Sequence, residues 1–67
     1  MNDFMVLNKL DNLRIELEAY MLMRDNLQKL IEVCHPYQFN QFMRKKLITT
    51  ARILQIQDDI SQIIREN

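Results

Sequence analysis

Apolar residues recur at alternating spacings of three and four along two long stretches of this chain, one on each side of its single proline. This spacing places the apolar residues on one side of an α-helix and is typical of the contact line of a coiled coil. The pattern predicts one helix from about residue 3 to 33 and another from about residue 36 to 65. Asn2 or Asp3 can accept hydrogen bonds from the first free amides of the first helix. The predicted contact line, which we name the seam, consists of Val6, Leu10, Leu13, Leu17, Tyr20, Leu27, Ile31, Phe39, Phe42, Ile53, Ile56, Ile60 and Ile63.

The break between the two helices is expected at Cys34 and His35. Pro36 suits the first position of a helix, because it lacks the amide hydrogen that has no partner there and its ring fixes φ. The residue before a proline is disfavoured in the helical conformation, so His35 belongs to the turn. A turn of residues 34–35 forces the helices to lie antiparallel and in contact. The sequence therefore predicts one all-α domain, residues 1–67, folded as a coiled-coil-like antiparallel two-helix hairpin with no sheet.

Folding the chain back at this turn sets which residues face each other across the seam. Leu17 is expected opposite Ile53, in an apolar layer. Arg24 falls opposite Lys46, so two like charges meet in the middle of the seam, which is unfavourable unless they are solvated or paired. Two arrangements remain open here. Either the long side chains extend outward to water, with Asp25 nearby, or a group from a partner enters this layer.

Both predicted helices also carry apolar residues away from the seam. A two-helix hairpin has one contact face, so these residues stay exposed to water in a monomer. An exposed apolar patch of this kind marks an interaction site, and burying each large side chain contributes about 1.5–3 kcal/mol. We therefore expect a protein partner, and the five methionines of the chain suit an adaptable surface. The candidate partner-binding residues are Ile15, Ala19, Leu22, Met23, Leu30, Val33, Met43, Leu47, Ala51 and Leu54.

The composition narrows the classes of function. Glycine is absent, which makes turns at positive φ hard to build and excludes a sheet of tight hairpins. Nine basic and nine acidic residues balance, so no general attraction to nucleic acid or to anionic lipid follows. No stretch reaches the roughly 18 apolar residues of a membrane-spanning helix, and the first residues lack the layout of a secretory signal. We expect a cytoplasmic protein without direct membrane insertion, and the single cysteine suits a reducing compartment.

No combination of residues indicates catalysis, a cofactor or a metal. Cys34 adjoins the only histidine, His35, but neighbours in a turn rarely point at each other as a thiolate and its base must. The same two residues are too few for a zinc site. The adjacent carboxylates Asp58 and Asp59 do not share a helix face. We expect this protein not to be an enzyme and to hold no cofactor.

A basic run, Arg44, Lys45 and Lys46, lies on the second predicted helix, and Arg52 follows two turns later. Binding to nucleic acid through this run would need a wider basic face or aromatic residues on which bases can stack. The aspartates at 58–59 reduce the local positive charge. A solvated helix face is the preferred interpretation, and no nucleic-acid partner is expected.

The second half of the chain carries a pattern of its own. After the turn come a proline, a Gln-aromatic-Gln patch and, later, a small residue ahead of an Ile/Leu pair. The residues concerned are Pro36, Tyr37, Gln38, Phe39, Asn40, Gln41 and Phe42, followed by Leu47, Ala51, Ile53, Leu54 and Ile60. Over residues 36–64 this pattern resembles the small co-chaperones of bacterial type III secretion, the YscE-like family. Two features depart from it: residues 34–35 replace a glycine-containing turn, and the basic run 44–46 stands where neutral polar residues are usual.

The resemblance implies both a fold and a role. Members of that family are short helical hairpins that bind a tetratricopeptide-like chaperone in the bacterial cytoplasm. The two together keep the needle subunit from polymerising before export. Two alternatives remain open from the residues alone. One is a homodimer that forms a four-helix bundle, like small plasmid regulatory hairpins, and the other is a hairpin that binds nucleic acid through its basic run.

Overall fold

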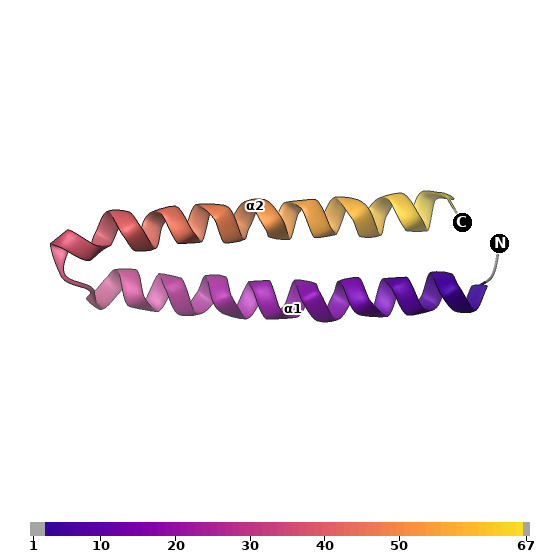
Figure 1. Ribbon diagram of the computed structural model, residues 1–67, viewed down its shortest axis with the longest axis horizontal. Helices are drawn as coiled ribbons and strands as arrows, with labels where there is room; N and C mark the ends of the chain where they lie inside the picture. Colours follow the sequence, from indigo (N-terminus) through magenta and orange to yellow (C-terminus); the bar gives the residue numbers. More distant parts are fainter. Residues whose placement is uncertain (1–2, 67) are drawn as a thin grey trace.

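The computed structural model describes residues 3–66 and consists of two α-helices joined by a short turn (Figure 1). Helix α1 spans Asp3–Val33 and helix α2 spans Pro36–Glu66. The helices run antiparallel, side by side, in a rod whose Cα atoms extend over 52 × 15 × 11 Å. The predicted all-α hairpin is confirmed, and α2 ends one residue later than expected. The expected role of Asn2 lies outside the described residues.

The turn closes with a small number of local hydrogen bonds. The backbone amide of Gln38 donates to the carbonyl oxygen of His35 at 2.9 Å, at the start of α2. The Cys34 thiol donates to the carbonyl oxygen of Ile31 at 3.5 Å, and so provides a partner for a carbonyl in the last turn of α1. No residue in the range 3–66 has a positive φ. The hairpin therefore turns without the left-handed conformation that glycine would favour.

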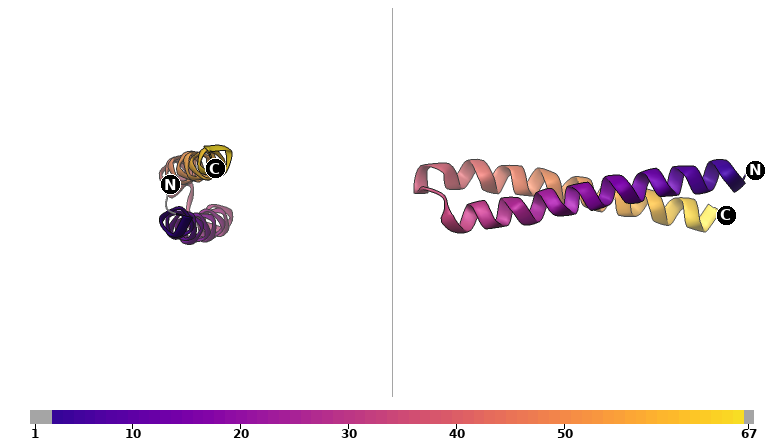
Figure 2. Two further views of the ribbon diagram at one scale, coloured as in Figure 1. Left: turned by 90° about the vertical axis from the view of Figure 1, so that its right-hand side faces the viewer. Right: turned by 90° about the horizontal axis from the view of Figure 1, so that it is seen from below.

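The two helices are not straight parallel rods. Viewed from below, they cross along the length of the hairpin, and the end-on view shows the same inclination (Figure 2). A seven-residue apolar repeat explains this, because a straight helix drifts by about 20° per seven residues relative to such a repeat. Winding the helices around each other keeps the seam in contact over its whole length.

The most buried residues lie in the middle of the seam. Leu27 of α1 and Thr49, Ile53 and Ile56 of α2 are buried, and Ile56 has 0% of its surface exposed. The other predicted seam residues are half-buried, with one exception, because each side chain is covered by a single facing helix. The exception corrects the prediction: Phe39 is 45% exposed. It lies in the first turn of α2, at the end of the rod, where α2 has no preceding turn to cover the ring.

The two basic side chains in the middle of the seam, Arg24 and Lys46, both have polar partners within the hairpin. Arg24 Nε lies 3.5 Å from Asp25 Oδ1, and Lys46 Nζ donates a hydrogen bond to Gln28 Oε1 on α1. Both basic side chains are half-buried. Each basic side chain thus has a partner on the hairpin itself: Asp25 for Arg24, and the Gln28 amide across the seam for Lys46. Lys46 does not extend outward to water as the first expected arrangement had it, and entry of a partner's group into this layer stays a prediction.

Thr49 is the one buried polar residue among those described, at a position where the seam otherwise holds apolar side chains. Its hydroxyl donates to the carbonyl oxygen of Lys45 at 2.8 Å and lies 3.7 Å from Met23 Sδ. Because the Thr49 hydroxyl donates to a carbonyl in the preceding turn of its own helix, it needs no hydrogen-bond partner from α1. Across residues 3–66, no buried side-chain nitrogen or oxygen lacks a hydrogen-bond partner.

Candidate interaction surface

The structure exposes nearly all the apolar residues proposed to bind a partner. Leu22 is 63% exposed and Leu47 is 67% exposed, although both belong to residue types that favour the interior. Met43 is different, because it is half-buried. It directly follows the seam residue Phe42, so its side chain lies at the flank of the seam rather than on the outside. The exposed candidates are Ile15, Ala19, Leu22, Met23, Leu30, Val33, Leu47, Ala51 and Leu54.

The exposed candidates of α1 form a line on its outward side. Successive residues of a helix are rotated by about 100°, so Ile15 and Leu22 lie roughly half a turn away from the seam. Ala19 lies between them, at the spacing of four and three that places residues on one helix face. Met23 and Leu30 border the line on one side, and Val33 continues it toward the turn. We name this set the α1 outer line: Ile15, Ala19, Leu22, Met23, Leu30 and Val33.

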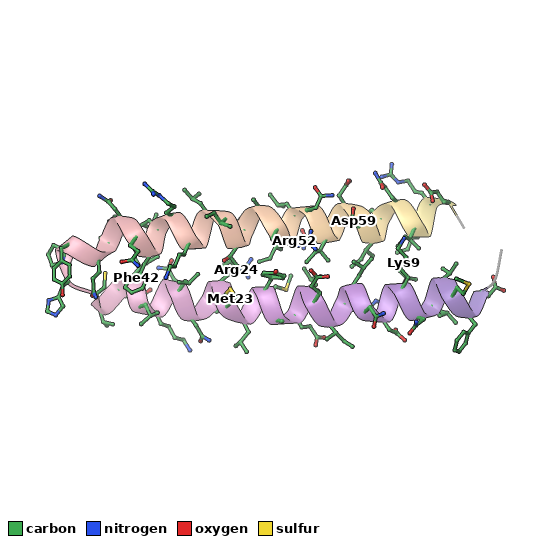
Figure 3. All side chains as sticks on the ribbon, viewed as in Figure 1. Lys9, Met23, Arg24, Phe42, Arg52 and Asp59 are labelled. Carbon is green, nitrogen blue, oxygen red and sulfur yellow. The ribbon has the colours of Figure 1, made fainter. Side chains whose placement is uncertain are left out.

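Helix α2 carries a shorter apolar patch on its own outward side. Leu47, Ala51 and Leu54 again follow the spacing of four and three, and Ile48 lies beside them, 65% exposed. We name these four residues the α2 outer patch. Because it faces away from the seam, as the α1 outer line does, the two surfaces lie on opposite long sides of the rod. Figure 3 shows side chains projecting from both of these sides.

The two apolar surfaces lie at the same level along the rod. Arg52 Nη2 lies 2.7 Å from Glu16 Oε1, and Thr49 contacts Met23, so residues 49–52 are level with residues 16–23. The middle third of the hairpin therefore has exposed apolar residues on both outward sides. A partner that covers both surfaces has to reach around the rod.

One flank between the helices is polar. The side chains of Arg52 and Glu16, 43% and 35% exposed, form the ion pair that bridges α1 and α2 on this flank. The hydrogen bond from Arg52 to Glu16, and then the negative charge of Glu16, raise the pKa of Arg52 above its ordinary value, with a smaller contribution from Tyr20. Further toward the open end, Lys9 and Asp59 are among the residues that line a surface hollow; Figure 3 labels both side chains. On α1 the same row continues toward the turn as Met23 and Leu30, at intervals of seven residues from Glu16. The matching row on α2, at intervals of seven from Arg52, holds Gln38, Lys45 and Asp59, so this flank offers no apolar surface that spans both helices.

Five more exposed apolar residues lie outside the seam, the α1 outer line and the α2 outer patch: Phe4, Met5, Leu7, Tyr37 and Ile64. Leu7 and Ile64 lie near the open end of the hairpin, and each directly follows a seam residue. That adjacency was visible in the sequence, since a residue next to the seam on each helix lies at its flank. At the turn, the ring of Tyr37 stacks on that of His35, with 5.5 Å between the ring centroids.

The basic run does not form one free cationic face. Lys46 donates a hydrogen bond to Gln28, and Arg52 forms an ion pair with Glu16. Only Arg44 and Lys45 remain fully outward, beside a shallow hollow on α2. Two basic residues supply little of the electrostatic attraction on which nucleic-acid binding depends.

The two turn residues, Cys34 and His35, each make a contact within the turn region. The Cys34 sulfur is directed at a carbonyl of α1 while the His35 ring stacks on Tyr37, so the structure does not bring thiol and imidazole together. Within residues 3–66 there is no group of three or more His, Cys, Asp or Glu side chains arranged to hold a metal ion. Neither described helix contains a segment whose length and apolar character would let it cross a bilayer.

Comparison of the chain with family models, with curated proteins and with solved structures finds no match. The features that a function has to explain are the α1 outer line, the α2 outer patch and the polar flank between the helices.

Proposed function

We propose that this hairpin is a protein-binding module whose α1 outer line and α2 outer patch dock on a helical partner protein. The observation that supports this proposal is that far more large apolar side chains are exposed than buried. Among residues 3–66, fourteen large apolar side chains are exposed, whereas three apolar residues are buried. Burying a large apolar side chain contributes about 1.5–3 kcal/mol. Covering five or six of them would rival the whole stability of a small domain, about 5–15 kcal/mol.

The proposal extends to the kind of partner, a tetratricopeptide-like chaperone in the bacterial cytoplasm. Two features of the chain support this choice. The first is the resemblance of residues 36–64 to the YscE-like co-chaperones of type III secretion. The second is geometric: the apolar surfaces lie on opposite sides of a rod, and the concave surface of a helical-repeat protein can reach around such a rod. In this role the hairpin stabilises the chaperone, and the pair keeps the needle subunit unpolymerised before export. The chain contributes binding and no chemistry.

A homodimeric four-helix bundle is the competing assembly. It needs an apolar surface that runs across both helices of each hairpin, so that four helices share one core. The flank with the Glu16–Arg52 ion pair is polar, and the largest exposed apolar surfaces face away from each other. These two features disfavour a second copy docked through that flank or through both outer surfaces. A bundle would have to use the opposite flank, where exposed Leu7 and Ile64 each follow a seam residue.

The test is co-expression of the chain with the chaperone and needle subunit of a type III secretion system from the same organism. We expect a stoichiometric complex that survives gel filtration. Leu22→Asp and Leu47→Asp should each abolish it, while the matched control Gln57→Asp, which adds the same charge at an exposed position outside both apolar surfaces, should leave it intact. A chain that stays a monomer with these partners present refutes the proposal. A tight dimer at micromolar concentration, disrupted by Leu22→Asp, would replace it with the homodimer.

A further inference from the structure

The α1 outer line is bordered on one side by acidic residues only. Asp11, Glu18, Asp25 and Glu32 follow each other at intervals of seven residues, which is two turns of helix, so they form one row along α1. The row is about 31 Å long at 1.5 Å per residue. All four side chains are exposed. We name this set the acidic row.

The acidic row lies directly beside the apolar residues. Residues three and four apart on a helix are surface neighbours. Ile15 therefore has Asp11 and Glu18 next to it. Leu22 has Glu18 and Asp25 next to it in the same way. A helix that covers Ile15 and Leu22 necessarily comes close to these carboxylates.

The charge of the row is only partly compensated within the hairpin. Asp25 pairs with its neighbour Arg24 at 3.5 Å, and Glu32 accepts a hydrogen bond from Gln28 at 3.2 Å. Arg14 is a surface neighbour of Asp11 and Glu18, and Lys29 is a surface neighbour of Asp25 and Glu32, at spacings of three and four. Neither basic residue forms an ion pair with the row within the described part of the chain, so four acidic side chains outnumber the basic residues beside them. The α1 outer line thus combines an apolar centre with a negative border.

This border disfavours a second copy of the chain as the occupant. Two α1 helices packed antiparallel through their outer lines would bring acidic row against acidic row, and like charges across an interface oppose association. The same charges favour a partner of the opposite sign. We propose that the α1 outer line binds an amphipathic helix of the partner, and this inference rests on the proposed function. The apolar face of that helix is bordered by lysine or arginine on the side that meets the acidic row.

The test uses two synthetic helical peptides with the same leucine-based apolar face, one bordered by lysines and the other by glutamates. Their binding to the full chain is measured by fluorescence anisotropy at low and at high salt. We expect the lysine-bordered peptide to bind about tenfold more tightly at low salt. The difference should shrink as salt rises, because exposed charge pairs are screened.

A charge-matched pair of double variants locates the effect. Asp11→Asn with Glu18→Gln should weaken binding of the lysine-bordered peptide about fivefold, in line with the modest strength of exposed ion pairs. Asp58→Asn with Glu66→Gln removes the same charge from α2 and should change the affinity less than about twofold. Equal effects of the two double variants, or equal binding of the two peptides, would overturn the inference.

The design separates this inference from the proposed function. If both peptides bind equally and Leu22→Asp abolishes both, docking at the α1 outer line stands and the basic character of the partner is refuted. If neither peptide binds while the co-expressed chaperone does, the basic helix is again refuted and the binding module is not.

Discussion

The core residue Ile56 provides the sharpest test of the hairpin. Its side chain has no exposed area, so Ile56→Ala removes buried methyl groups and leaves a cavity in the seam. Large-to-small changes of this kind cost about 2–5 kcal/mol. A seam only two helices wide can partly collapse around the gap, which places the expected loss at about 2–3 kcal/mol. A domain of this length has roughly 3–10 kcal/mol in total, at about 0.05–0.15 kcal/mol per residue.

The assay is urea unfolding followed by circular dichroism, at several protein concentrations so that any contribution from association is visible. With a slope near 1 kcal/mol per molar urea, the midpoint for Ile56→Ala should fall by about 2–3 M. Ile48→Ala is the matched control, because it makes the same chemical change at a position that is 65% exposed. A surface change of that kind should stay within about 0.5 kcal/mol. If the two variants lose the same stability, the division into seam and outward surface is wrong.

Three further predictions follow from the seam and its flank. Leu17→Asp should unfold the hairpin, while Leu22→Asp should keep its helicity; equal loss of the helical circular dichroism signal in both would contradict the assignment. Lys46→Met keeps the aliphatic stem and removes one of two like charges from the seam, so the free energy of unfolding should rise by about 1 kcal/mol and the urea midpoint by about 1 M; a lower midpoint would mean that the hydrogen bond from Lys46 to Gln28 contributes more. Glu16→Arg and Arg52→Glu should each destabilise the hairpin, and the double variant should recover stability; a double variant as unstable as the singles in low salt would refute a stabilising ion pair.

The architecture was accessible from the sequence because a few residues decide it. Pro36 fixes where α2 begins, and the absence of glycine leaves the helices without an internal break. The three-and-four spacing then identifies the contact face of each helix. Residues such as Ile53 and Ile56 lie in the seam for this reason, and both are buried.

The details that the pattern missed depend on three-dimensional neighbours. Phe39 has the right spacing for the seam, but its place at the end of the rod leaves its ring partly uncovered. Met43 was expected among the outward residues, yet it is half-buried, because it lies at the flank of the seam. The bond from Lys46 to Gln28 depends on the register between the helices, which the spacing within one helix does not give. The opposite orientation of the two apolar surfaces likewise became clear only once α1 and α2 were placed against each other.

The two-residue turn has a practical consequence for handling this protein. Because the chain reverses once, Asp3 and Glu66 lie at the same end of a rod 52 Å long, and the single cysteine, Cys34, lies at the other end (Figure 1). Affinity tags fused to either terminus would therefore stay at the far end from the tip. A molecule immobilised by its tag would extend away from the support, with both long sides accessible to a binding protein.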